Sequence, residues 1–322
     1  MKSVGLRAIW QARKRIAPII PKSPLIYSPE LSKLTGAYVH LKLENLNPSG
    51  SFKIRGAANK IISLSKDEQQ RGITTFSTGN FGLSVAYMAK NLGIKAVICI
   101  SNHVPQAKVE ALKRIGADIE IHGESQDDAE QRSYKLAREE GYTVIHPFDD
   151  PHVIAGQGTI GLEILEDLPE VDTVIAGLSG GGLHAGLGIA LKSADPSLRL
   201  IGVSPTNGAT MYESLKQGKL VTTREQATLA DSLLGGIGLE NKYTFELIKQ
   251  YVDEIILVNE IEIASGMIFM LNQHRLIIEG AAAAGIGAIS NGKVQYGSQV
   301  VLVITGASVD PSIVYELARK LQ

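Results

Sequence analysis

The feature that most constrains the fold of this 322-residue chain is a regular alternation of short apolar runs with segments of helical period. The runs are apolar on both faces and are separated by helical segments of about 10–15 residues, a pattern typical of parallel sheets built from strand–helix–strand units. The sequence therefore predicts an α/β fold of mostly parallel twisted sheets with helices on both faces. We expect strands within nine runs, at 38–43, 72–77, 95–101, 117–123, 142–147, 171–178, 198–204, 253–258 and 298–305.

Composition excludes several classes of function. The 32 basic and 33 acidic residues are mixed along the chain and give a formal net charge of -1, so we expect neither a nucleic-acid nor a membrane-surface partner. Cys99 is the one cysteine and lies in an apolar run, which excludes internal disulfides and indicates a reducing compartment.

The sequence shows no signal for export or for a membrane. Residues 1–20 are typical of an amphipathic helix rather than of a signal peptide, and no apolar run is long enough to span a membrane. We expect a cytoplasmic protein.

One break interrupts both periodicities. Between residues 146 and 161, Pro147 and Pro151 interrupt the strand and helix patterns. This break is therefore the best candidate for a domain boundary.

Three turns from strand to helix are rich in small residues, at 77–89, 177–192 and 303–312. Backbone N–H groups at the start of a helix form a ready anion site, and consecutive glycines let a backbone wrap closely around a phosphate. The turn from Ser179 through Gly180, Gly181 and Gly182 to Leu183 is the strongest of the three, although a tight turn that requires positive φ is the alternative.

Dinucleotide and nucleotide triphosphate sites are less consistent with this turn. Gly180, Gly182 and Gly186 have a spacing close to the dinucleotide fingerprint, but Ser204 stands where the next strand should carry an acidic residue. No phosphate-loop motif with the G-x-x-x-x-G-K-[ST] pattern occurs. A monophosphate site remains.

Lys53 follows the small and polar residues Ser49 to Ser51 and Phe52 and stands at the start of an expected helix. It is either a solvated lysine at a helix start or a reactive amine. A reactive amine, a monophosphate site and a hydroxyl at a buried strand end, here Thr305, are what pyridoxal phosphate requires of a protein.

These motifs resemble the fold-type II pyridoxal-phosphate enzymes, in particular the serine/threonine dehydratases and serine racemase, over nearly the whole chain. The resemblance implies that Lys53 holds the cofactor beside Phe52 and that Thr305 faces the pyridine nitrogen. In "STGNFG", it implies that Ser77, Thr78 and Gly79 clasp the substrate carboxylate and that Asn80 bonds the cofactor 3′-oxygen. The phosphate is implied to bind at Ser179, Gly180, Gly181, Gly182 and Leu183.

The implied reaction is β-elimination of water from a hydroxy amino acid, such as threonine or serine, to give a 2-oxo acid and ammonia. Lys53, its pKa lowered by burial, serves as the base for the α-proton. A threonine hydroxyl is too weak an acid to protonate the pyridine nitrogen, which favours elimination over transamination. The resemblance also implies two α/β domains, a smaller one at 72–147 and a larger one formed by 1–71 together with 148–322. The small domain is expected to close over the substrate and carry Asn80 toward the ring.

Five positions depart from the family pattern or leave alternatives open. Phe81 replaces a usual histidine and alters the substrate pocket. Thr78 stands where serine racemase has its acid–base serine, and carboxylate binding or helix capping is the alternative. Ser204 and, nearby, Thr210 occupy expected ligand positions of the racemase metal site, so we predict no metal. Glu279 either contacts the cofactor ring or caps the following helix.

Three other functions remain open. Motifs such as "ADSLLGGIGLEN" resemble dehydratases of hydroxyectoine utilisation, which implies a diamino-hydroxy acid as substrate. A serine or aspartate racemase would use Lys53 and Thr78 on opposite faces of the substrate. A phosphate-ligand sensor on a degenerate enzyme fold is the non-catalytic reading. The family usually dimerises, which implies a homodimer.

Overall fold

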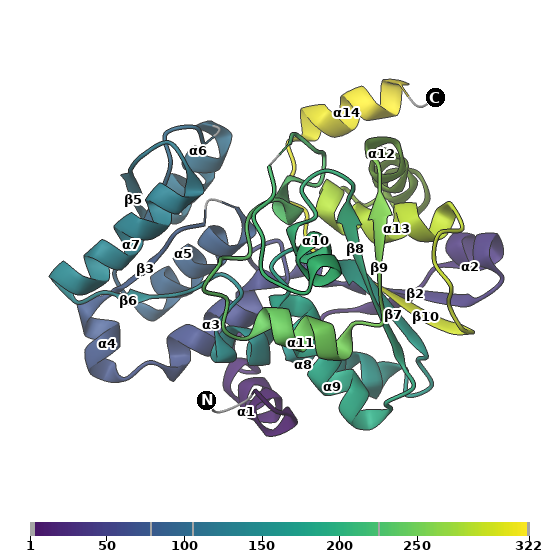
Figure 1. Cartoon of the computed structure of the whole chain (residues 1–322), viewed down its shortest axis with the longest axis horizontal. Helices are drawn as coiled ribbons and strands as arrows, with labels where there is room; N and C mark the ends of the chain where they lie inside the picture. The colour runs from purple at the N-terminus through teal and green to yellow at the C-terminus, as the bar shows by residue number, and fades with distance from the viewer. Residues whose placement is uncertain (1–3, 78, 105, 225, 321–322) are drawn as a thin grey trace.

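The computed structural model describes residues 4–77, 79–104, 106–224 and 226–320, and these form two separate sheets, one in each half of the molecule (Figure 1). The larger sheet has the order β1(Leu25–Tyr27), β2(Tyr38–Leu43), β10(Gln299–Ile304), β7(Thr173–Gly177), β8(Arg199–Pro205), β9(Glu254–Val258). The smaller sheet has the order β5(Asp118–Ile121), β4(Ala96–Ile100), β3(Ile73–Thr75), β6(Thr143–Val144).

Every strand pairing in these sheets is parallel except that between β1 and β2. The predicted α/β fold with mostly parallel sheets is confirmed, and each of the nine predicted runs contains a strand. Strand β1 was not predicted. Its apolar run is no longer than the three residues of the strand itself and is bounded by Pro24 and Ser28, so no longer pattern marks it in the sequence.

The helices cover both faces of each sheet, as the parallel pattern requires. The segment 6–16 is helical, as the sequence predicted. The helices are α1(Leu6–Ile16), α2(Pro29–Thr35), α3(Lys53–Ser63), α4(Lys66–Arg71), α5(Asn80–Leu92), α6(Gln106–Ile115), α7(Gln126–Glu140), α8(Pro151–Asp167), α9(Gly182–Ala194), α10(Thr210–Gln217), α11(Thr244–Tyr251), α12(Glu260–Phe269), α13(Gly280–Ser290) and α14(Pro311–Lys320), with shorter helical turns η1(Glu44–Leu46), η2(Asp231–Leu233) and η3(Met270–His274).

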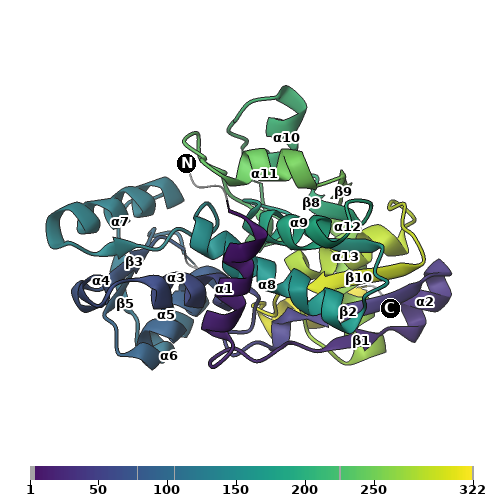
Figure 2. The same cartoon turned by 90° about the horizontal axis from the view of Figure 1, so that it is seen from below.

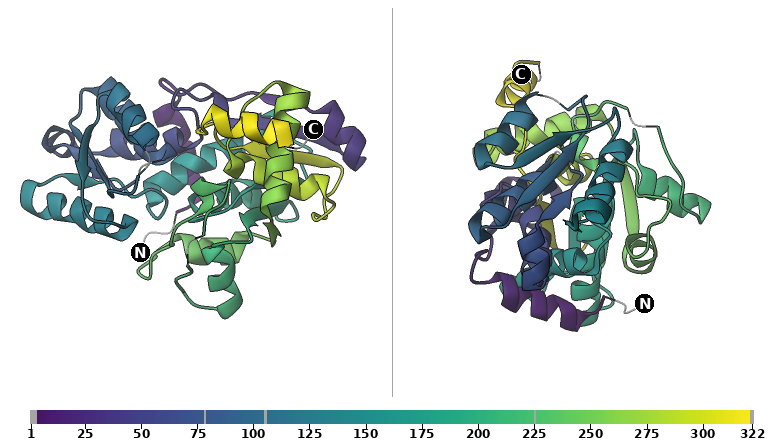
Figure 3. Two further views of the ribbon diagram at one scale, coloured as in Figure 1. Left: turned by 90° about the horizontal axis from the view of Figure 1, so that it is seen from above. Right: turned by 90° about the vertical axis from the view of Figure 1, so that its left-hand side faces the viewer.

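The core of the larger half lies on both faces of its sheet. Helices α2, α12, α13 and α14 pack on one face, and α8 and α9, backed by α1 and α11, pack on the other. Figure 2 shows α1 lying against α8, and Figure 3 shows α14 on the outer side of this half beside α12.

The smaller sheet also has an apolar cluster on each face. On one face, Ile54 and Ile61 of α3 share a cluster with Ile73 of β3 and Ile98 of β4. On the other face, α7 covers β3 and β4, and Cys99 is buried there. Helix α3 therefore packs on the smaller sheet although it precedes residue 72, so the boundaries at 72 and 147 stay a prediction.

Helix α3 crosses α8 at very short range. A Cβ atom on Gly156 of α8 would lie 2.5 Å from the carbonyl oxygen of Arg55 and 2.7 Å from the Cα of Gly56. Real Cβ atoms do not approach so closely, so only glycine permits this crossing. The contact holds the first turn of α3 against the larger half of the molecule.

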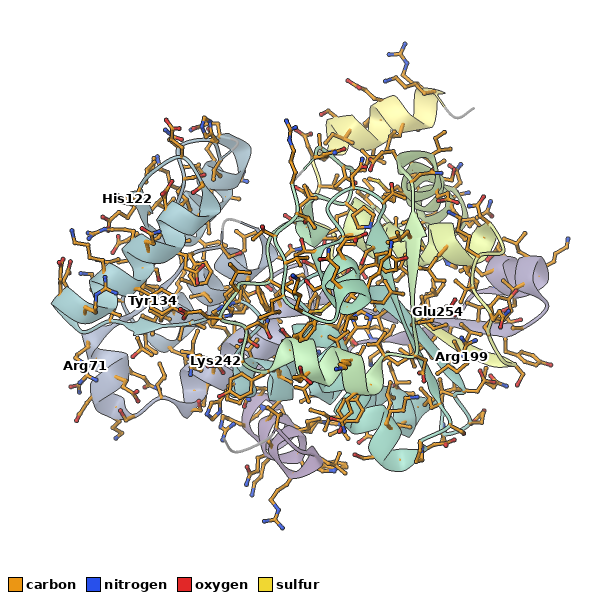
Figure 4. All side chains as sticks on the ribbon, in the orientation of Figure 1. Arg71, His122, Tyr134, Arg199, Lys242 and Glu254 are labelled. Atoms are coloured by element: carbon orange, nitrogen blue, oxygen red, sulfur yellow. The ribbon has the colours of Figure 1, made fainter. Side chains whose placement is uncertain are left out.

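The surface carries ion pairs such as Arg199 with Glu254, on the neighbouring strands β8 and β9, whose charged atoms lie 2.8 Å apart (Figure 4). Because both side chains are about one-third exposed, such pairs contribute little to stability. Among the helices within residues 4–320 that are described, none is long and apolar enough to cross a membrane.

Candidate active site

A cavity of about 160 Å³ lies where the ends of β7 and β10 meet the starts of α3, α5 and α9. Ligands of open α/β sheets bind at this carboxyl edge of the strands. The predicted site residues that line the cavity are Phe52, Lys53, Ser77, Gly79, Asn80, Phe81, Ser179, Gly180, Gly181, Gly182, Leu183, Glu279 and Thr305. Thr78 lies outside the described residues.

Lys53 is the first residue of α3, and its amine faces the cavity. Its loop is tied to the end of β10, because the N–H of Phe52 donates to the carbonyl oxygen of Thr305 at 3.0 Å and Ser51 forms a β-bridge with Gly306. Burial lowers the pKa of Lys53 to about 8, and the negative charge of Glu279 opposes that shift. A substantial fraction of this amine is neutral near pH 8.

Asn80 and Glu279 meet across the cavity from opposite halves of the molecule. The Nδ2 of Asn80, the first residue of α5, donates to both carboxylate oxygens of Glu279 at 2.8 and 2.9 Å. Ser232 Oγ also donates to Glu279, at 3.3 Å. Glu279 stands at the N-cap position of α13, but its side chain makes no capping hydrogen bond within the described part of the chain. Its carboxylate lines the cavity instead.

The glycine turn before α9 combines tight packing with an uncapped helix start. Gly181 has φ of 87°, a left-handed conformation that favours glycine, and no side chain caps the helix there. A Cβ atom on Gly180 would lie 2.6 Å from Cγ of Phe148, so the ring of Phe148 also requires glycine at this position. The N–H groups at the start of α9 are thereby left for an anion.

The family of pyridoxal-phosphate dependent enzymes matches residues 16–306 of the chain. The chain belongs to this family. The likeness of its motifs to this class, predicted from the sequence, is confirmed, and so is the cofactor, pyridoxal phosphate.

Curated relatives and solved structures of this pyridoxal-phosphate enzyme align over nearly its full length. The chain is 40% identical to the L-threonine ammonia-lyase of Thermotoga maritima over 98% of this chain and 79% of that protein. It is 43% identical to the catabolic L-threonine dehydratase TdcB of Staphylococcus aureus over 95% of this chain and 90% of that protein. The structure of maize serine racemase superposes with a TM-score of 0.92 at 31% identity, covering 99% of this chain and 98% of that one.

The residues of the cavity fit pyridoxal phosphate. The buried amine of Lys53 suits the aldehyde, and the uncapped start of α9 suits the phosphate. Oδ1 of Asn80 is buried and has no hydrogen-bond partner among the described residues, so it is available to a polar group in the cavity. Thr305 is buried at the end of β10, facing the same space.

The sequence did not indicate that His146, Phe148 and Asp149 hold the segment after β6 in place beside the cavity. His146 Nδ1 accepts the N–H of Asp149 at 2.9 Å, and its ring packs edge-on against Phe148. Asp149 in turn accepts the N–H groups of Tyr243 and Thr244 at the start of α11, each at 2.9 Å. The prolines of the segment "HPFDDP" indicate a domain boundary, but nothing in the sequence indicates that His146 and Asp149 beside them bind distant or neighbouring backbone groups.

Phe81 lines the cavity but is only 1% exposed, since its ring belongs to the apolar cluster on the smaller sheet.

The hydroxyls at the expected metal positions make hydrogen bonds within the protein. Ser204 Oγ donates to the carbonyl oxygen of Leu178 at 2.7 Å, and Thr210 Oγ1 lies 2.5 Å from Oγ1 of Thr223. Within the described ranges, no group of three or more His, Cys, Asp or Glu residues could hold a metal ion. The absence of a metal stays a prediction.

Proposed function

We propose that this enzyme is an ammonia-lyase that converts L-threonine, and L-serine in the same way, into a 2-oxo acid and ammonium. For threonine, water is lost across Cα and Cβ and water is taken up again when ammonium leaves, so the products are 2-oxobutanoate and ammonium. The observation that carries the proposal is the buried Lys53 amine, with its pKa of about 8, in one cavity with an uncapped helix start. The names of the two curated relatives support the same reaction.

The roles of the cavity residues follow from their chemistry. Backbone N–H groups from Ser179 to Leu183 would hold the cofactor phosphate, and the amine of Lys53 would hold its aldehyde carbon, since these residues line one cavity. The amide of Asn80 would bond the 3′-oxygen, and the hydroxyl of Thr305 would bond the ring nitrogen, since both residues line the same cavity. Ser77 and Gly79 bind the substrate carboxylate, together with Thr78, which lies outside the described residues.

Lys53 moves the proton in this proposal. Pyridoxal phosphate, when bound, withdraws electrons from the α-carbon of an amino acid joined to it. The neutral amine of Lys53 removes the α-proton, which its lowered pKa permits near neutral pH. The Thr305 hydroxyl is too weak an acid to protonate the ring nitrogen, which favours loss of the β-hydroxyl over transamination.

We also propose that residues 72–147 move as a unit when substrate binds. Asn80 lies at the start of α5 in this segment, whereas its partner Glu279 lies in the larger half. Closure of the segment over the cavity would exclude water from the amine of Lys53 and from the α-carbon.

The test is a proton NMR time course in D₂O with cofactor and L-threonine, L-serine or a hydroxylated diaminobutyrate. A 2-oxo acid formed from threonine or serine is the expected result. Loss of the α-proton signal without oxo acid, together with appearance of the D-enantiomer, would instead establish racemisation, the second candidate, which the likeness to maize serine racemase favours. Turnover of the diamino acid alone would name the hydroxyectoine-type substrate. Silence with every substrate, matched by Lys53→Ala, would overturn the catalytic proposal.

We further propose a homodimer in the cytoplasm. Large apolar side chains are exposed around the β1–β2 edge and α2, where Tyr38 is 59% exposed, Leu34 56% and Tyr27 46%. Exposed apolar patches of this kind mark interfaces between proteins. Light scattering coupled to gel filtration should give twice the 34.5 kDa chain mass.

The proposed cytoplasmic location is supported by Cys99. This thiol is buried, burial raises its pKa, and a lone free thiol suits a reducing compartment.

A further inference from the structure

Four charged side chains are buried together behind the start of α3. They are Lys42 of β2, Glu44 of η1, Arg55 of α3 and Glu163 of α8, and each is at most 3% exposed. With two positive and two negative charges the cluster is neutral. None of the four side chains lines the cavity, so the proposed reaction does not use them.

Arg55 is held at both edges of its guanidinium group by two carboxylates. Its Nε and Nη2 donate to the two oxygens of Glu44 at 2.7 and 2.8 Å. Its Nη1 and Nη2 donate to the two oxygens of Glu163 at 2.7 and 2.8 Å. Lys42 Nζ adds a bond to Glu163 at 2.8 Å, and Ser23 Oγ one to Glu44 at 2.5 Å.

Stability alone does not account for this arrangement. Burying an ion costs several kcal/mol even after the protein relaxes, and well-packed apolar residues in place of a buried ion pair are often equally or more stable. What a doubly bidentate arginine adds is a fixed orientation, because its planar fork matches each carboxylate in one geometry only. The four side chains come from segments as far apart as residues 42 and 163, so that orientation is set relative to the larger sheet.

Arg55 follows Lys53 by two positions in the same helix. At 3.6 residues per turn, two positions correspond to about 200° around the helix axis, so the two side chains leave α3 on nearly opposite sides. Any rotation of the first turn that relaxed the contacts of Arg55 would turn the amine of Lys53 away from the cavity.

We propose that Arg55, clamped between Glu44 and Glu163, is a positioning residue that fixes the rotation of the first turn of α3 and thereby aims Lys53 into the cavity. This inference rests on the proposed role of Lys53. Arg55 acts through the helix and touches neither cofactor nor substrate.

Two variants test the clamp. Arg55→Lys keeps the positive charge but loses the planar fork. The double variant Arg55→Gln/Glu44→Gln removes one charge of each sign and leaves the pair of Lys42 and Glu163 intact, so it leaves no unpaired buried charge and is the second test if the first variant does not fold. The matched control is Asp172→Asn, because Asp172 also accepts several hydrogen bonds but at the amino ends of β7 and β10, away from the cavity.

The first measurement uses the protein without cofactor. Cyanate carbamylates neutral amines, so mass spectrometry of Lys53 across pH reports its pKa, which is about 8 in the native chain. We expect the inflection to rise by about one unit in both Arg55 variants, because an amine released from burial returns toward its ordinary value of 10.5. Asp172→Asn should keep the native inflection.

The second measurement uses the complete enzyme. We expect kcat to fall at least about tenfold in the Arg55 variants, while KM stays within about twofold of the native value. The reason is that the variants lose the orientation of the Lys53 amine and keep the substrate-binding groups. Variants that unfold more easily but keep the native inflection and kcat would assign the cluster to stability and overturn this inference alone. An active Lys53→Ala enzyme would overturn the proposed role of Lys53 as well.

Discussion

Lys53 has an ordinary position in the helix and an unusual environment. It begins α3, a place where a lysine normally stays solvated, yet here its half-buried side chain lines the cavity beside the ring of Phe52, with Nζ 5.0 Å from the ring centre. Burial lowers its pKa, and the carboxylate of Glu279 limits how far the pKa falls. At this scale, the reactivity of one amine depends on one charge and on the exclusion of water.

Glu279→Gln should lower the pKa of Lys53 below about 8, because removing a nearby negative charge disfavours the protonated amine. The carbamylation profile of Lys53 measures this, and Glu254→Gln, on the surface at β9, is the control. An unchanged or higher inflection would show that Glu279 does not act on Lys53 through its charge.

Gly180→Ala should weaken cofactor binding by at least about tenfold, because its Cβ would lie 2.6 Å from Cγ of Phe148 and displace the phosphate turn. Equilibrium dialysis with pyridoxal phosphate measures the affinity. Gly5→Ala, where a Cβ meets nothing within 4 Å, is the control. Native affinity in Gly180→Ala would mean that Phe148 moves aside freely.

At the scale of elements, the crossing of α3 and α8 determines where the first turn of α3 can lie. Gly56 and Gly156 bring the two backbones together, and the buried charges of Arg55 and Glu163 hold them in one orientation. Helix α8 is therefore a support for the site although its central residues do not line the cavity.

Gly156→Ala should lower the free energy of unfolding by about 1–3 kcal/mol, since a methyl group at the crossing forces the helices apart. Urea denaturation provides the measurement. Gln217→Ala, exposed at the end of α10, should change stability by less than about 0.5 kcal/mol. Equal stability of the two variants would argue against a rigid crossing.

At the scale of the whole molecule, the site exists only because two halves meet. Asn80 and Glu279 are 199 positions apart, and Asp149 links the segment after β6 to α11. Two histidines lie within this framework: His184 of α9 is buried, and His146, at the junction of the halves, is half-buried. Burial lowers the pKa of each to about 4.

Stability should therefore fall as the pH drops from about 6.5 toward 4. Both histidines stay neutral in the folded chain, whereas the unfolded chain takes up protons below the ordinary pKa of 6.5, so acid favours unfolding. Urea melts at pH 7 and pH 5 should differ by about 2 kcal/mol for each histidine. His184→Asn should remove about half of that difference, and an unaltered pH slope would contradict the prediction.

The sequence by itself determined the α/β fold, every strand of the two sheets except β1, and the cofactor, and it named many of the residues that line the cavity. These depend on local signals: side-chain alternation along strands, helical period, and glycines or a lysine at the turns between them. Their roles in catalysis stay predictions until the variants are measured.

Only the tertiary structure decided how distant side chains pair. Nothing local to Arg55 indicates that Glu44 and Glu163 enclose it, and nothing local to Glu279 indicates that it binds Asn80 rather than capping α13. The edge strand β1, with three residues, likewise forms only because β2 offers it a partner. A charge or a short strand has no preferred partner until the chain has folded, because its energy depends on which distant groups replace water around it.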